Sequence, residues 1–373
     1  MDRKDEIQEK VDRLVRMLAA ERAGGVLIKS RHNFSWLSAG GTNTVDTTRE
    51  AGVAALLVRD DGKCFALASR IEMPRLVAEE IPLNVFEPIE FAWQEEKGNA
   101  NLFVERANGL LKDKPLCADI PFDAATPVLE SSIARCRHQL TAPEIERYRT
   151  LGRDAGEAVE HLVRNLHPGI TEQEVARRAD AALAERGARN IVTLVAADER
   201  VKRFRHPVPT RKRWEKVLMV VICAERGGLV ASLTRIVCTG PVPDELESRT
   251  LTAARVNAQM LSRTRPGAHA ADLFDTATRA YAAEGFPGEE NFHHQGGATG
   301  YRTRDWVAHP ACKEVVQMNQ AFAWNPSITG TKVEDTCITG DGTIELITST
   351  PDWPKITASV EGHEYLSPAV LSI

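Results

Sequence analysis

The stretch Asn291-Phe-His-His-Gln-Gly-Gly-Ala-Thr-Gly-Tyr-Arg-Thr-Arg-Asp-Trp306 gathers two histidines, a glutamine and two arginines around three glycines. Glycine has no Cβ, so its backbone can pass close to a ligand or to a neighbouring strand. Polar and basic side chains on such a segment are typical of a pocket wall. A polar surface loop is the alternative interpretation of the same residues.

The composition is that of an ordinary globular protein. The chain has 373 residues, a net charge of -5 and 43% hydrophobic residues, with no long basic run or acidic tail, so we expect no nucleic-acid partner. No apolar run approaches the ~20 residues of a membrane span, and the charged N-terminus has no apolar segment behind it. The seven cysteines are scattered and show no C-x-x-C spacing. These features predict a cytoplasmic protein with reduced thiols and no membrane partner.

The first third of the chain alternates helical and strand-like patterns. Apolar residues at helical spacing predict a helix over residues 4–22, and a strand follows at residues 26–28. Residues 53–58 and 64–68 flank an Asp-Asp-Gly turn and predict a hairpin. We therefore expect a compact α/β domain over residues 1–139.

A long helical pattern begins behind Ala142-Pro143, and the part of the chain beyond it contains an internal repeat. Pro168-Gly169 recurs as Pro266-Gly267, and Gly187 recurs as Gly285, both at an offset of 98 residues. Each Pro-Gly precedes a helix of similar length. Residues 140–373 are therefore predicted to form two duplicated halves around a pseudo-two-fold axis, with a ligand site in the cleft between them.

Two details of the repeated helices are also predicted. In the first copy, Thr171 and Glu174 have the spacing of a capping box, in which each side chain bonds the backbone N–H of the other residue. In the second copy, Tyr281 belongs to the buried stripe, and we expect its hydroxyl to turn outward.

Four fragments occur in an order that is typical of the pita-bread proteins: the methionine aminopeptidases, the Xaa-Pro peptidases (aminopeptidase P and prolidase) and creatinase. The fragments are Ser232-Leu-Thr-Arg235, Phe292-His-His-Gln-Gly-Gly-Ala-Thr-Gly-Tyr301, Trp324-Asn-Pro326 and Val333-Glu-Asp-Thr336. The chain resembles this family over nearly its whole length. The resemblance implies an α/β N-terminal domain followed by an α+β pita-bread domain with pseudo-two-fold duplicated halves.

The peptidases of this family hold two divalent metal ions with two Asp, one His and two Glu. In this chain, the resemblance puts other residue types at all but the last of those positions: Val221, Ser232, Ala298, Asn325 and Glu334. Valine and alanine cannot ligate a metal, and hard cations require several oxygen ligands. We therefore expect no metal ion at these positions and no other cofactor.

Creatinase, which has the same fold without the metals, implies which groups carry the chemistry. Its catalytic histidine corresponds to His206, and the carboxylate retained in both groups corresponds to Glu334. An imidazole and a carboxylate with a water between them are sufficient for general acid–base hydrolysis. The residues predicted to bind the substrate are His293, His294, Gln295, Arg302, Asp305, Arg235 and Lys332.

The basic side chains favour a substrate that carries a carboxylate, because arginine matches planar anions with two hydrogen bonds. Thr234 stands where creatinase has a glutamate beside the arginine, so creatine is not implied. For Arg304 and Asp305, a surface ion pair is the alternative to a binding role.

Three functions therefore remain open. The first is a metal-independent hydrolase that acts on a C–N bond of a small polar compound. The second is a non-catalytic relative that binds a small molecule or a protein, and the third is a metal-dependent Xaa-Pro peptidase. The resemblance also implies a homodimer in which the loop from Trp36 to Arg49 approaches the partner's site.

Overall fold

The protein divides into two compact units, Met1–Glu144 and Ile145–Ile373. The structure, a computed structural model, describes residues 2–111 and 114–373. Within these residues, no helix combines the length and the apolar character that crossing a membrane requires.

The first unit is built around a five-stranded mixed sheet with the strand order β4-β3-β2-β1-β5. Its strands are β1 (Gly25–Ser30), β2 (Ala51–Arg59), β3 (Cys64–Ser69), β4 (Phe86–Phe91) and β5 (Leu116–Ala118). Its helices are α1 (Arg3–Glu21), α2 (Arg31–Leu37), α3 (Met73–Arg75), the π-helical turn η1 (Leu76–Glu80), α4 (Trp93–Gly98), α5 (Leu102–Leu111) and α6 (Glu130–His138). The predicted first helix, first strand and hairpin are confirmed by α1, β1 and the antiparallel β2–β3 pair.

The first half of the second unit joins three helices to a mostly antiparallel sheet, and the first of these helices begins in the last residues of the first unit. Its elements are α7 (Ala142–Arg164), α8 (Glu172–Ala184), β6 (Arg189–Ala197), α9 (Glu199–Arg203), β7 (Val217–Arg226) and β8 (Leu229–Cys238). Strands β6, β7 and β8 pair in sequence, and β18 (Leu371–Ser372) adds to β8 in parallel. The register of the β7–β8 hairpin puts Val221 opposite Thr234 and Cys223 opposite Ser232.

The second half contains another helix pair and a five-stranded sheet with the order β10-β9-β11-β14-β15. The helices are α10 (Asp244–Arg263), α11 (Ala270–Ala283) and the 3-10 turn η2 (Glu289–Asn291). The strands of this sheet are β9 (Gly296–Thr299), β10 (Trp306–Val307), β11 (Ala321–Trp324), β14 (Asp335–Thr339) and β15 (Ile344–Leu346). Two hairpins complete the half: β12 (Ser327–Ile328) with β13 (Thr331–Lys332), and β16 (Lys355–Val360) with β17 (His363–Pro368).

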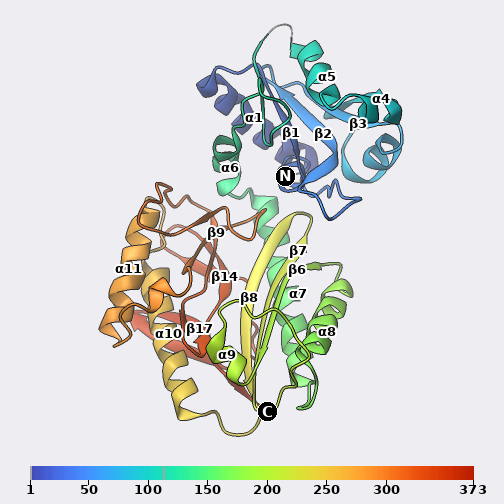
Figure 1. The fold of residues 1–373 in the computed structure, drawn as a ribbon. Coiled ribbons are helices and arrows are strands. Elements are labelled where there is room, and N and C mark those ends of the chain that lie inside the picture. Colours follow the sequence, from blue (N-terminus) through green and yellow to red (C-terminus); the bar gives the residue numbers. More distant parts are fainter. Residues whose placement is uncertain (1, 112–113) are drawn as a thin grey trace. The chain divides into compact units, whose positions relative to one another are not determined.

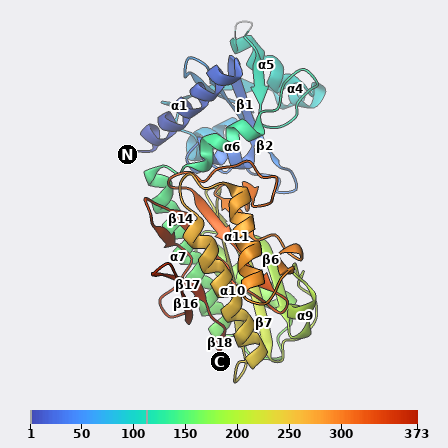
Figure 2. The same ribbon diagram turned by 90° about the vertical axis from the view of Figure 1, so that its left-hand side faces the viewer.

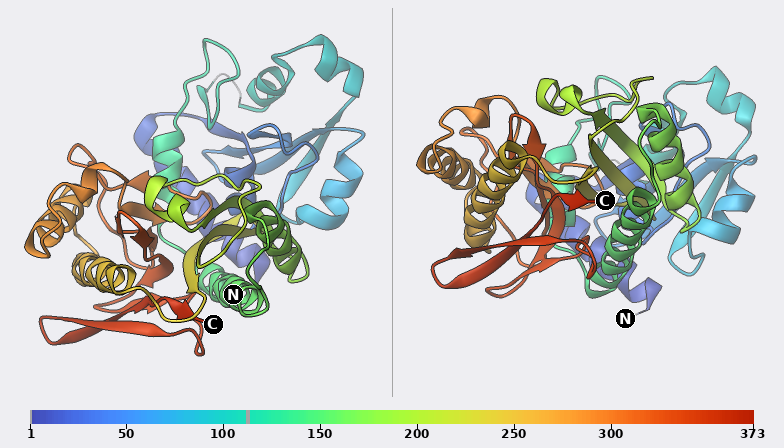
Figure 3. Two further views of the ribbon diagram at one scale, coloured as in Figure 1. Left: turned by 60° about the horizontal axis from the view of Figure 1, so that its bottom comes forward. Right: turned by 90° about the horizontal axis from the view of Figure 1, so that it is seen from below.

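Helices cover the strands of this unit on two sides. Figure 1 shows α10 and α11 beside β9 and β14, and α7 and α8 beside β6 and β7, and Figure 2 again shows α11 next to β14. The apolar faces of α10 and α11 form one core with the second-half sheet, through residues such as Met260, Tyr281 and Phe322. The β16–β17 hairpin lies along α10 (Figure 3), where Ala358 and Val360 pack against Ala258.

The predicted duplication is confirmed by equivalent backbone contacts in the two halves. The Gly169 N–H donates to the Trp214 carbonyl oxygen at 2.7 Å, and the Gly267 N–H donates to the Val316 carbonyl oxygen at 2.9 Å. Each contact introduces a helix, α8 or α11, and two residues further on each half makes an isolated antiparallel bridge. The same turn therefore starts the second helix of both halves.

The capping box at the start of α8 is only half formed. The Thr171 hydroxyl accepts the Glu174 N–H at 3.2 Å, as predicted. The Glu174 carboxylate instead pairs with Arg177 and Arg178 on the exposed face of the helix. Two nearby guanidinium groups compete with the backbone N–H for that carboxylate.

The two halves meet where β8 passes the residue that precedes β14. The Thr234 N–H donates to the Glu334 carbonyl oxygen at 3.1 Å, and the Thr234 hydroxyl donates to the Glu334 carboxylate at 2.7 Å. This contact links the β7–β8 hairpin to the segment before β14 in the second half. The predicted catalytic residues lie near this junction.

Candidate functional site

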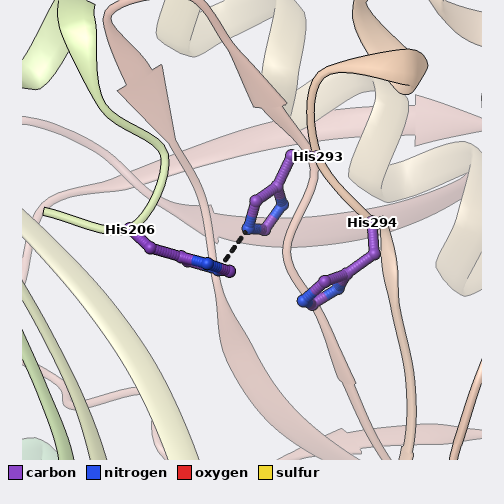
Figure 4. A group of neighbouring side chains, drawn as sticks. All are labelled: His206, His293 and His294. Atoms are coloured by element: carbon purple, nitrogen blue, oxygen red, sulfur yellow. Dashed lines mark hydrogen bonds between the residues drawn. The ribbon is translucent and has the colours of Figure 1, made fainter.

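Three histidines from different loops converge in the second unit. His206 lies between α9 and β7, and His293 and His294 lie between η2 and β9. The Nε2 atoms of His206 and His293 are 3.0 Å apart. The ring centroids of His293 and His294 are 4.4 Å apart, in a stacked arrangement. Figure 4 shows the three imidazoles pointing toward one another, and one nitrogen from each lies within 4.8 Å of the other two.

Gly296, in the glycine-rich stretch, lies where its backbone passes very close to the neighbouring strand β11. A Cβ at Gly296 would lie 2.1 Å from the Ala323 carbonyl oxygen, and Gly296 has a φ of 97°. Both features exclude a larger residue. The Gly296 N–H donates to His294 Nδ1 at 3.2 Å. The predicted role of these glycines in letting the backbone pass closely therefore applies to the neighbouring strand β11.

The surroundings keep the three imidazoles neutral. Burial, assisted by the charge of Lys332, lowers the pKa of His293 to about 2. Burial and the charge of Arg304 lower the pKa of His294 to about 4. The pKa of the partly exposed His206 is also lowered, by burial first and then by Lys332. At neutral pH each ring therefore has one N–H donor and one nitrogen lone pair.

Glu334 is buried and holds two cations. Its carboxylate lies 2.8 Å from Lys332 Nζ and 3.0 Å from a terminal nitrogen of Arg304. Burial on its own raises the pKa of this carboxyl group, but the two cations and the Thr234 hydroxyl lower it to about 2. Glu334 is thus ionised at neutral pH. Because two cations surround one carboxylate, the local charge is positive.

Glu334 does not contact His206 directly. Within residues 2–111 and 114–373, the side chains that bond the Glu334 carboxylate are Thr234, Lys332 and Arg304. The side-chain partner of His206 is His293. The charge of Glu334 still reaches His206, where it raises the pKa in opposition to burial. Among the described residues, His206 and Glu334 therefore do not form the direct imidazole–carboxylate pair expected of the two predicted catalytic groups.

Gln295 lies behind the histidines rather than among them. It is fully buried, and its side-chain oxygen accepts the Tyr281 hydroxyl at 2.7 Å. Its side-chain nitrogen donates to the His293 carbonyl oxygen. The expected outward turn of the Tyr281 hydroxyl is wrong, because this hydroxyl points inward and also accepts the Ser327 N–H at 2.8 Å. Tyr281 and Gln295 together hold the backbone that carries His293.

Arg235 also faces the interior. It is 2% exposed, and its guanidinium donates to Asp335 at 2.9 Å and to the Thr348 carbonyl oxygen at 2.8 Å. A guanidinium with these partners anchors the start of β14. The structure places Arg302 and Asp305 on the turn between β9 and β10, outside the histidine cluster. The residues it does bring together are His206, His293, His294, Lys332, Glu334 and Arg304.

Arg304 is the residue whose role the sequence left undecided. Its side chain is 12% exposed and pairs with the buried Glu334, so the ion pair does not lie on the surface. Its Nε atom is buried and has no hydrogen-bond partner among the residues that the structure describes. Arg302 and Arg304 are two residues apart in the same glycine-rich stretch. In the folded chain, Arg304 pairs with Glu334, whereas Arg302 lies outside the histidine cluster.

The side chains at the positions of the family's metal ligands do not fit a pair of divalent ions. Val221 packs in an apolar core with Met219 and Ile236, and the buried Ser232 hydroxyl donates to Cys223 Sγ at 3.2 Å. Ala298 belongs to the core beneath α10 and α11. The remaining carboxylate, Glu334, is already bonded to two cations. Oxygen ligands for two hard cations are missing from this set.

The fold is that of a two-domain pita-bread protein, as predicted from the sequence. A family model, Metallopeptidase family M24, matches residues 146–345. The chain therefore belongs to metallopeptidase family M24.

Solved structures share this fold over nearly the whole chain. The Xaa-Pro dipeptidase from Bacillus anthracis is 16% identical with a TM-score of 0.76, covering 98% of this chain and 100% of its own. The X-Pro aminopeptidase from Thermotoga maritima MSB8 is 16% identical with a TM-score of 0.75, covering 97% and 99%. The N-terminal domain of the FACT complex subunit SPT16 from Cicer arietinum is 10% identical with a TM-score of 0.69, covering 92% and 96%. The search of curated proteins gave no match.

Proposed function

We propose that this protein is a hydrolase that cleaves a C–N bond of a small polar compound without the two metal ions of its family. The observation that supports the proposal is the 3.0 Å contact between the partly exposed His206 and the buried His293. Beside these rings, Lys332 and Arg304 share one carboxylate, Glu334, so this group of three has a net positive charge. Membership of a peptidase family supports hydrolysis as the class of reaction. The missing oxygen ligands favour proton transfer by imidazole over activation of water by metal ions.

His206 is the proposed general base. If its Nε2–H donates to Nε2 of His293, its Nδ1 keeps a lone pair that can accept a proton from water. The hydroxide attacks the carbon of the C–N bond. The leaving nitrogen then takes the proton back from His206 as the bond breaks. Such proton transfer is worth about 10²- to 10⁴-fold in rate.

Lys332 and Arg304 are the proposed electrostatic partners of the substrate. Glu334 neutralises one of these two positive charges, and the other favours a substrate carboxylate or the negative charge that develops on the attacked group. Glu334, which the sequence predicted as a second catalytic group, is assigned here to hold the two cations. Gln295 and Arg235 are assigned a structural role instead of substrate binding, because both are buried and hydrogen-bonded to other protein groups. Arg302 and Asp305 lie outside the histidine cluster, so their role in substrate binding stays a prediction from the sequence.

A non-catalytic binding module is the second candidate. The saturated contacts of Glu334 favour it, because a carboxylate that already bonds two cations and a hydroxyl is a poor base. In that case Lys332 and Arg304 would bind a small anion, and the histidines would donate hydrogen bonds to this anion. A conventional metal-dependent Xaa-Pro peptidase is disfavoured by Val221, Ser232, Ala298 and Asn325.

A substrate screen with a matched histidine variant tests these candidates. Amidine, ureido, lactam and N-acyl amino-acid compounds are assayed for turnover in chelator-treated buffer. We expect His206→Ala to lower kcat by about 10²- to 10⁴-fold, whereas His167→Ala, at an exposed histidine after α7, leaves it unchanged. Equal turnover by the His206 variant would remove His206 from the mechanism. Thermal stabilisation by a compound that is not turned over would favour the binding module.

A further inference from the structure

We propose that His206, His293 and His294 form a binding site for a single first-row transition-metal ion, distinct in every residue from the two-metal centre of the family. The geometry that supports this site is the convergence of one nitrogen from each ring within 4.8 Å. Two imidazole nitrogens at about 2.0–2.1 Å from one tetrahedral ion lie about 3.3 Å apart. The His206 and His293 nitrogens are already 3.0 Å apart, so small ring rotations bring them to ligand positions once the proton between them moves to Nδ1 of the ring that carries it.

The third ligand is His294, whose tautomer has to change when an ion binds. His294 Nδ1 accepts the Gly296 N–H at 3.2 Å, so Nε2 carries the proton of the neutral ring. An ion at Nε2 requires this proton to move to Nδ1, which ends the contact with Gly296. His294 and His206 are partly exposed, so an ion can enter from solvent. Tyr281 and Gln295 hold the His293 backbone from behind, which limits how far the buried ring has to move.

The ligand set selects the kind of metal. Three neutral imidazoles suit Zn²⁺, Co²⁺, Ni²⁺ and Cu²⁺, whereas Mg²⁺ and Ca²⁺ require oxygen ligands. Lys332 and Arg304 oppose any cation, and Glu334 offsets one of the two charges. The ion is therefore expected to bind with an anion, such as hydroxide or chloride, at its open fourth position.

Metal occupancy has a consequence for the reaction, and this part rests on the proposed function. A coordinated His206 has no free lone pair with which to accept a proton from water. Its hydrogen bond to His293 is also lost, because both nitrogens then face the ion. We therefore expect the metal-free protein to be the active hydrolase and the ion to inhibit it.

Direct binding measurements test the metal site without any assay of activity. Chelator-treated protein is titrated with Zn²⁺, and with Mg²⁺ as a comparison, by calorimetry, and Co²⁺ binding is followed by visible absorption. We expect one Zn²⁺ per chain, a tetrahedral Co²⁺ spectrum and no response to Mg²⁺. His294→Gln and His206→Gln should each weaken Zn²⁺ binding roughly tenfold or more, since each removes one metal–nitrogen bond. His167→Gln should bind like the wild type.

The outcomes separate the two proposals. Unchanged Zn²⁺ affinity in both cluster variants, with folding verified by circular dichroism, would overturn the metal site. Absence of Zn²⁺ binding would do the same while leaving the hydrolase proposal intact. If Zn²⁺ binds and turnover of a substrate from the screen falls with occupancy, the inhibitory role is supported. If turnover is unchanged or rises at full occupancy, the inhibitory role is overturned although the site stands.

Discussion

Lys29 on β1 illustrates how one buried charge influences stability. Its amine lies 3.2 Å from the centroid of the Phe103 ring. Burial lowers its pKa to about 8, although the charges of Glu96 and Asp119 act in the opposite direction. The unfolded chain therefore binds one more proton than the folded chain between pH 8 and the ordinary value of 10.5. The free energy of unfolding should rise with pH across this window.

Lys29→Met is predicted to stabilise the first unit at pH 7. The variant removes the cost of burying a charge and keeps an apolar side chain against Phe103, so we expect a gain of about 1–3 kcal/mol in the free energy of unfolding. Urea denaturation at several pH values measures the effect. The rise between pH 8 and 10.5 should be present in the wild type and smaller in the variant. Parallel pH profiles for the two proteins would contradict the prediction.

Glu334→Gln is predicted to destabilise the second unit strongly. Loss of the carboxylate charge leaves Lys332 and Arg304 buried without their partner, which costs about 3–5 kcal/mol in comparable cases. Glu345→Gln is the control, because Glu345 pairs with Arg149 at an exposed position where ion pairs are worth about 1 kcal/mol or less. Thermal or urea unfolding compares the two variants. Equal losses would show that the buried carboxylate is not needed to hold these cations.

At the scale of elements, helix α7 depends on glycine for its position. A Cβ at Gly152 would lie 2.4 Å from the Ile347 carbonyl oxygen, and a Cβ at Gly156 would lie 2.5 Å from the Thr348 carbonyl oxygen. These glycines are one helical turn apart and face the same segment. Alanine normally stabilises a helix by about 1 kcal/mol relative to glycine. In α7, the steric cost of placing a Cβ against these carbonyl oxygens has to be compared with the gain in helix propensity.

Gly152→Ala is predicted to destabilise the protein, because overpacking against a backbone carbonyl costs about 1–3 kcal/mol and exceeds the gain in helix propensity. Gly109→Ala in α5 is the matched control, since a Cβ there meets no atom within 4 Å. The control should be neutral or stabilised by up to about 1 kcal/mol. Melting temperatures of both variants show whether each substitution stabilises or destabilises the protein. A stabilised Gly152 variant would mean that α7 can shift away from Ile347 at little cost.

The sequence predicted elements better than it predicted side-chain partners. Helical periodicity and the Pro-Gly repeat depend on residues close together in the chain, and they indicated α1, the β2–β3 hairpin and the duplicated halves. Two of the three partners of Glu334 come from distant segments of the chain, so no local pattern shows that it bonds Thr234 and Arg304 rather than His206. The direction of Tyr281 was also mispredicted, because a tyrosine on a buried stripe can turn its hydroxyl either way. In the folded protein, the hydrogen bond that the Tyr281 hydroxyl donates to the buried Gln295 turns this hydroxyl inward.

At the scale of the whole molecule, we propose that two copies of the chain associate. The loop from Trp36 to Arg49, which the resemblance assigns to the partner's site, carries Val45 with 61% of its side chain exposed. Sedimentation should give twice the chain mass of 41.1 kDa. Val45→Asp should weaken the association, whereas Val128→Asp, at another exposed valine, should not. A wild-type monomer at micromolar concentration would refute the dimer.

The origin of the histidines in two related halves has a consequence for how a ligand is oriented. His206 comes from the first half, and His293 and His294 come from the second, so the two walls of an ancestrally symmetric centre are no longer equivalent. One imidazole therefore faces two. A two-fold axis would allow a small molecule with unlike ends to bind in two equivalent directions, whereas unlike walls distinguish the two directions. Divergence of the duplicated halves thus provides a basis for binding in a single direction.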